Sequence, residues 1–121
     1  MLGFGAATAE VVELLTAAGV SASDDPSALE LPGVWVTPGQ PSISFEYLDG
    51  DRYIGRWDLY LISPDLKVPE ALDHLSELLD RIRTALRGAV TEATAVTIPL
   101  PNHAADNLPA LLITIDQEVT P

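Results

Sequence analysis

The chain has no cysteine among its 121 residues, which excludes disulfide bonds and cysteine-ligated metal sites. It also lacks an uninterrupted apolar run of about 18 residues, so we predict no membrane-spanning helix and no membrane partner. No basic cluster precedes an apolar stretch in the opening residues, and we therefore expect no signal peptide. The lack of cysteine also fits a reducing compartment.

Basic residues are scarce: six lysines and arginines stand against 18 acidic residues, for a net charge of −12. So much negative charge repels phosphate backbones, which disfavours a general grip on nucleic acid. The charge could serve solubility alone, or it could keep a surface close to DNA without binding it. The apolar fraction is 47%, and the length suits one domain with one hydrophobic core. We assign residues 1–121 to a single domain.

Two segments have the apolar spacing of amphipathic helices. The first covers residues 6–18, with Thr8 as a possible N-cap and Gly19 as the residue that ends it. The second begins at Pro69, ends at Gly88, and carries acids in its first turn and arginines in its last two turns, in agreement with the helix dipole. Its apolar stripe consists of Leu72, Leu75, Leu78, Leu79, Ile82 and Leu86.

Other segments have the pattern of strands. Residues 34–37 predict a short strand that Pro38 and Pro41 end, and residues 21–32 predict a loop. Residues 95–100 predict an edge strand, whereas residues 110–119 begin almost continuously apolar, as a central strand does. Strands before and after one helix predict an α+β fold: a mostly antiparallel sheet of about 4–5 strands, with two amphipathic helices packed on one face.

The segment ISFEYLDGDRYIGRWDLYLI, residues 43–62, predicts a hairpin around Asp49 and Gly50. A two-residue turn there would bring the charge of Glu46 onto the apolar face. A loop of three or five residues keeps the faces separate, and we predict that register because side-chain alternation decides register more strongly than a turn dipeptide. The predicted pairs are Tyr47 with Tyr53, Phe45 with Gly55, and Ile43 with Trp57.

The two predicted faces of the hairpin differ in character. One face, with Trp57, Leu59 and Leu61, is apolar and is expected to lie beneath the helices. The other mixes aromatic, aliphatic and charged side chains, which is typical of a subunit contact, although an ordinary two-sided strand gives the same pattern. The candidate contact residues are Glu46, Ile54, Arg56, Asp58 and Tyr60. The hairpin loop could engage a partner or simply turn; its residues are Asp49, Gly50, Asp51 and Arg52.

Side chains suited to catalysis or metal binding do not form a pattern that specifies a reaction. His103 and Asp106 could be two ligands or an acid–base pair, but a polar loop explains them as well. His74 stands near Glu70 and Glu77 on one side of the second helix, as on any exposed helix face. The sequence has no glycine-rich phosphate loop and no nucleophile elbow. We predict no enzyme activity, no metal and no cofactor, with His103 or the hairpin carboxylates as the alternative.

In size, acidity and order of elements the chain resembles the tail terminator proteins of long-tailed (siphovirus-type) bacteriophages. Four stretches carry the resemblance and cover nearly the whole chain: AEVVELLTAAG, the hairpin, PEALDHLSELLDRIRTALRG, and the closing pair AVTIPLPN and PALLITIDQEV. The most suggestive part is RWDLYLIS followed by a helix that begins with proline.

The resemblance implies a structural protein of the virion tail and neck, assembled in the host cytoplasm. Such subunits close into a homo-oligomeric ring, commonly a hexamer, that caps the tail tube, ends tail polymerisation and joins the tail to the head connector. The implied partners are other copies of the chain, the tail tube protein and the head–tail connector protein. Genome DNA would pass through the lumen without specific binding.

By position, the resemblance makes the reverse hairpin face with Glu46, Arg56 and Asp58 a subunit contact and residues 49–52 a loop that reaches the tube or the lumen. Residues 21–31 could form a second contact. Two further readings stay open: another neck component, such as a head–tail connector or head-completion protein, and a small α+β binding domain unrelated to phages.

Overall fold

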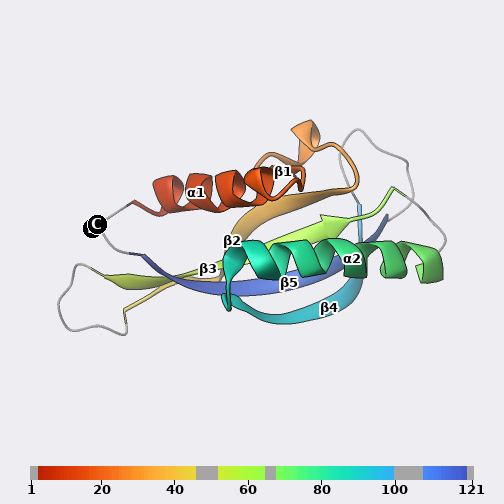
Figure 1. Cartoon of the computed structure of the whole chain (residues 1–121). Coiled ribbons are helices and arrows are strands. Elements are labelled where there is room, and N and C mark those ends of the chain that lie inside the picture. The colour runs from red at the N-terminus through yellow and green to blue at the C-terminus, as the bar shows by residue number, and fades with distance from the viewer. Residues whose placement is uncertain (1–2, 46–51, 65–67, 100–107, 120–121) are drawn as a thin grey trace.

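The computed structural model describes residues 3–45, 52–64, 68–99 and 108–119. Its strands form one sheet in the order β1-β2-β3-β5-β4. β1 runs parallel to β2 and the other neighbours are antiparallel, which confirms the predicted α+β class (Figure 1). The elements in chain order are α1 (Phe4–Ala17), β1 (Ala22–Ser23), the 3-10 helix η1 (Pro26–Ala28), β2 (Gly33–Ser44), β3 (Tyr53–Ile62), α2 (Val68–Leu86), β4 (Val90–Ile98) and β5 (Leu108–Val119).

Both long helices lie over the same side of the sheet, which we call the helix-covered face (Figure 1). α1 buries Ala7, Val11 and Leu15, one residue per turn, because a spacing of four keeps side chains on one side of a helix. α2 has a 19-residue amphipathic pattern, but no helix within the described ranges is long and apolar enough to cross a membrane. The sheet side of this core consists of Val34, Val36, Tyr53, Trp57, Leu59, Leu61, Ile113, Ile115 and Val119.

The first turn of α1 is fixed by Trp57. The helix starts at Phe4, and the Phe4 and Trp57 rings stack with centroids 4.9 Å apart. Thr8 is therefore not the N-cap, as predicted, but an interior residue, and Gly3 is the N-cap without a side-chain bond. The Thr8 hydroxyl accepts a hydrogen bond from the Trp57 indole N–H at 2.9 Å and donates one to the Phe4 carbonyl at 2.8 Å. The helix ends before Gly19, whose φ is 83°.

The predicted register of β2 against β3 is wrong. Ile43 pairs with Gly55 rather than with Trp57, and the ladder shifts between Pro38 and Ile43. Because the displacement along β3 is an even number of residues, the paired residues Ile43 and Ser44 of β2 and the residues of β3 keep their predicted faces. Gly55 makes room for an aromatic ring, as expected, but the ring belongs to Trp57: a Cβ at this position would collide with it.

β2 does not end at residue 37, as predicted, but continues through Pro38 and Pro41. β1 pairs only with Val34 and Trp35, so the later part of β2 has β3 on one side and an open edge on the other. A proline, which has no N–H, is tolerated at such an edge. β4 is an edge strand and β5 lies between β3 and β4, both as predicted, although β4 begins at residue 90 rather than 95.

Candidate functional site

Within the described part of the chain no helix covers the other side of the sheet, here called the reverse face (Figure 1). β3 alternates buried and half-buried residues, because successive side chains of a strand point to opposite faces. This alternation places four of the five predicted contact residues side by side on the reverse face, while Glu46 lies outside the described residues. The four are Ile54, Arg56, Asp58 and Tyr60, all half-buried.

Arg56 is held at the centre of the reverse face by groups of its own chain. It lies directly opposite Asp116 on β5, and its Nε and Nη2 donate to the two carboxylate oxygens at 2.7 and 3.0 Å. Its Nη1 also donates to the Gln40 carbonyl at 3.4 Å. A Cβ at Gly39 would collide with the Arg56 stem, so glycine allows β2 to close over it. A paired, fork-shaped contact of this kind fixes the orientation of the guanidinium.

The pKa values of the two carboxyl groups beside Arg56 shift in opposite directions. The hydrogen bond from Arg56 lowers the pKa of Asp116, against a smaller opposing effect of burial. Partial burial raises the pKa of Asp58, and the positive charge of Arg56 offsets part of that rise. Sequence reasoning missed Asp116 as the partner of Arg56. The signal was its alternation with Ile113 and Ile115, which places it on the reverse face.

The other half of the reverse face is aromatic and aliphatic. Tyr60 stacks on Trp35 of β2, with ring centroids 5.3 Å apart, and pairs across strands with Leu112 of β5. Sequence reasoning missed Trp35 too, although it alternates with the buried Val34 and Val36. Trp35 and Tyr60 also pack against a small cluster of buried apolar residues: Leu29, Ile62, Ile98, Leu108 and Ala110. Aromatic anchors beside a fixed charge pair have the composition of a protein contact.

A polar row separates the two halves. Asp58 pairs with Thr37 on one side and with Thr114 on the other, and Thr114 pairs with Glu92 of β4. A shallow hollow lies at the β4 end of this row, between Arg56, Glu92 and Thr114. Charged and hydroxyl side chains, which can form hydrogen bonds, therefore lie next to the aromatic half.

The predicted hairpin loop is described only at its end. Asp49, Gly50 and Asp51 lie outside the described residues. Arg52 precedes β3, and its Nη1 lies 3.3 Å from Glu118 Oε1 with both side chains exposed by about 40% (41% and 43%). An exposed pair of this kind contributes about 0–1 kcal/mol, so it adds little to the stability of the sheet.

The segment 21–32, predicted as a loop and a possible second contact, contains β1 and η1. Asp25 caps η1: its Oδ1 accepts hydrogen bonds from the Ser27 N–H at 3.0 Å and from the Ser27 hydroxyl at 2.7 Å. These bonds lower the pKa of the Asp25 carboxyl. The segment thus presents a defined, acidic surface beyond the β2 edge of the sheet.

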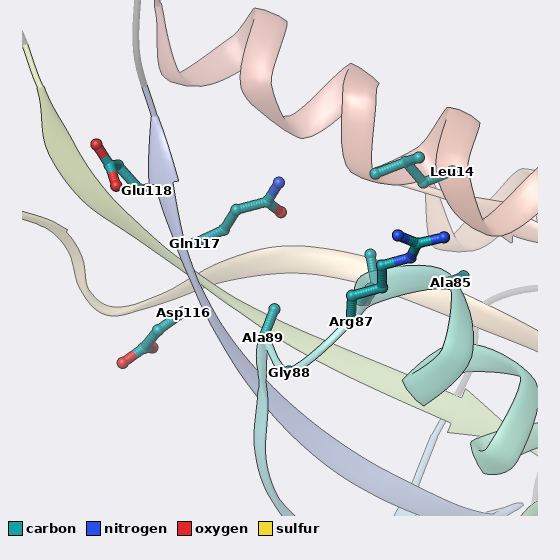
Figure 2. A pocket seen from close by; sticks show the side chains of 9 residues that line it. Leu14, Ala85, Arg87, Gly88, Ala89, Asp116, Gln117 and Glu118 are labelled. Atoms are coloured by element: carbon teal, nitrogen blue, oxygen red, sulfur yellow. The ribbon is translucent and has the colours of Figure 1, made fainter.

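A second hollow lies where the end of α2 meets α1 and β5 (Figure 2). Figure 2 shows Gln117 pointing into this space and Arg87 extending toward Leu14, while Asp116 and Glu118 point away. Gln117 Oε1 is buried and has no hydrogen-bond partner among the described atoms. A guanidinium and an amide could bind a carboxylate here, but the lining residues include no nucleophile.

Within residues 3–45, 52–64, 68–99 and 108–119, no group of three or more histidine, aspartate or glutamate side chains could hold a metal ion. His103 and Asp106 lie outside these ranges. His74 is exposed on α2. No protein-family model matches the chain, and no curated protein matches its sequence.

Proposed function

We propose that the chain is a structural subunit that assembles with copies of itself through the reverse face. The assembly is the ring that caps a phage tail tube, ends tail polymerisation and joins the tail to the head connector. One observation carries self-assembly: a sheet face that no described helix covers holds both the Trp35–Tyr60 stack and the Arg56–Asp116 pair. The resemblance in size, acidity and element order supports the tail assignment.

Tryptophan, tyrosine and arginine are the residues that most often dominate binding energy at protein interfaces. Arg56 is already held by Asp116, and Trp35 and Tyr60 hold each other, so contact with a partner would immobilise few additional side chains. The reverse face is therefore preorganised for binding.

A ring that closes by rotation needs two different patches on each subunit. The reverse face supplies one, and the acidic segment around η1 with Asp24 and Asp25 supplies an unlike second patch beyond β2. Arg56 is the basic group on the first patch that an acidic neighbour would approach. The net charge of −12 suits a lumen through which DNA slides without adhering.

The test uses the chain mixed with a tail tube protein from the same phage genome, because a tail terminator can stay monomeric until it meets its tube. Electron microscopy should show closed rings on tube ends, with a pore that admits duplex DNA. Rings without affinity for the tube protein would indicate another neck component. A monomer under all these conditions would contradict self-assembly and favour a small binding domain.

The matched variants are Thr114→Arg and Thr84→Arg. Thr114 lies on the reverse face between Asp58 and Glu92, so an added arginine meets acids, and we expect the fold to tolerate it. Thr84 is exposed on α2, away from the reverse face. We expect Thr114→Arg to abolish ring formation and Thr84→Arg to leave it intact, at unchanged circular dichroism. Equal assembly of both variants would refute the reverse face as the contact.

A further inference from the structure

We propose that the free edge of β4 pairs antiparallel with β4 of a second copy, in a two-fold dimer. This contact is separate from the one proposed for the reverse face, because it uses the backbone edge of the sheet rather than its surface. The dimer can therefore be tested separately from the ring.

Among the described strands β4 is the last of the sheet, and its backbone groups alternate between facing β5 and facing away from it. Ser63 N–H donates to the Pro109 carbonyl at 3.0 Å, so Pro109 directs its backbone toward β3. In β5 the even-numbered residues therefore direct their backbone groups toward β4. Asp116 is an example: its backbone N–H donates to the carbonyl of Ala89, just before β4, at 3.0 Å. By the register, Ala93, Ala95 and Thr97 turn their N–H and C=O groups away from β5.

The two edges of the sheet differ in protection. On the β2 side, β1 covers Val34 and Trp35, and Pro38 and Pro41 interrupt the donors beyond them. β4 contains no proline and no lysine, and Glu92 is its one charged residue. Residues 91–95 are exposed. Sheet proteins usually protect such an edge, and an unprotected one is a template for another strand.

Charge on α2 selects a second copy as the occupant. α2 lies alongside β4 and runs in the opposite direction, since a tight turn joins them and Leu72 near its start lies beside Val96 and Thr97 near the end of β4. The N-terminal half of α2 carries Glu70 and Asp73, Glu77 stands at its midpoint, and Asp80 lies just beyond it, with Oδ1 3.6 Å from Arg83 Nη1. Arg81 and Arg83 follow in its C-terminal half, and Arg87 follows the helix.

A two-fold axis turns the second copy end for end. The 19 residues of α2 span about 28 Å and the nine residues of β4 span about 30 Å, so a dimer centred on the middle of β4 is also centred on the middle of α2. The acidic half of each helix then lies across from the basic half of the other. Parallel addition of the same strand would set acids against acids, which disfavours it.

The register follows from the same axis. Centred on Thr94, the pairing sets Ala93 of one copy opposite Ala95 of the other, and both residues turn their backbone groups outward. Glu92 then meets Val96, so no acid of β4 opposes another acid.

The first experiment measures dimerisation by sedimentation velocity over a range of concentrations. Ala95→Pro removes an outward N–H, whereas Thr94→Pro removes one that faces β5. We expect wild type to dimerise and Ala95→Pro to remain a folded monomer, while Thr94→Pro loses helix and sheet signal by circular dichroism. Thr114→Arg should dimerise like wild type. A wild type that stays monomeric, or a folded Ala95→Pro variant that dimerises equally well, would overturn the proposal.

The second experiment tests the two-fold arrangement by charge exchange. Arg83→Glu and Asp73→Arg should each weaken self-association about tenfold or more, because each homodimer then has two like-charge contacts. An equimolar mixture of the two variants should recover wild-type affinity, since both contacts of the mixed dimer again join opposite charges. A mixture that associates no better than either variant alone would contradict the two-fold axis.

Discussion

The two faces of the sheet are made of the same strands, yet neighbouring residues along a strand differ in burial. On β3, Leu59 and Leu61 are fully buried beneath the helices, whereas Asp58 and Tyr60, which alternate with them, are half-exposed. The helix-covered face holds the domain together, and the reverse face carries the side chains that we propose contact a partner. Fold and contact surface are thus separated one residue at a time along a strand.

The two tryptophans show the same contrast. Each stacks on one aromatic ring, Trp57 on Phe4 and Trp35 on Tyr60. Trp57 is 1% exposed and its indole N–H is satisfied by Thr8, while Trp35 stays half-buried on the reverse face. The type of residue therefore does not decide its role: the covering helix does.

The largest expected effect comes from the same truncation on each face. Leu59→Ala should reduce the free energy of unfolding by about 2–5 kcal/mol, because it leaves a cavity among helix and sheet side chains. Leu112→Ala, on the half-exposed reverse face, should cost about 1 kcal/mol or less, because water already reaches the site. Urea unfolding of the two variants measures both. Equal losses would mean that the reverse face is also a core.

The second effect concerns the hydrogen bond that ties α1 to Trp57. Thr8→Val keeps the shape of the side chain but leaves the buried indole N–H without its acceptor, which should cost about 1–3 kcal/mol. Thr16→Val is the control in the same helix: its hydroxyl donates only to the Val12 carbonyl on the exposed side. Thermal unfolding should separate the variants. A Thr16→Val loss as large as that of Thr8→Val would remove the special role of Trp57.

Period-two alternation was enough to predict the class of fold and the faces of β3, because burial beneath a helix selects every second residue. It could not predict the register of the hairpin. That depends on the irregularity between Pro38 and Ile43, and on the close approach of Gly39 to Arg56. The prediction that prolines end β2 made this strand too short. The sequence does not reveal that β1 covers just two residues of β2, so that the prolines lie at an open edge.

Contacts between distant parts of the chain explain the remaining differences. Arg56 and Asp116 are 60 residues apart, and nothing local indicates their pairing. The apolar stripe of α2 is confirmed as amphipathic spacing, but its members differ in burial: Leu75 and Ile82 are fully buried, while Leu79 is partly exposed. Leu79 would therefore be a weaker probe of stability than its place in the stripe suggests. Which stripe positions are buried depends on how the helix is rotated over the sheet.

The smallest effect, on the reverse face itself, is the pH dependence of its two aspartates. Asp116 has a lowered pKa in the folded state, so its stabilising contribution is fully present above the unfolded value near 3.8 and is lost as the pH falls through its folded pKa. Asp58 has a raised pKa, so its ionised form disfavours folding near neutral pH, and this penalty disappears as the pH falls through its folded value. Asp116→Asn should therefore lower stability near neutral pH, and Asp58→Asn should raise it. Both differences should shrink well below pH 3.8, and urea unfolding at the two pH values measures them. Changes of the same sign in the free energy of unfolding of both variants would show that the contact with Arg56 does not make these two carboxylates differ.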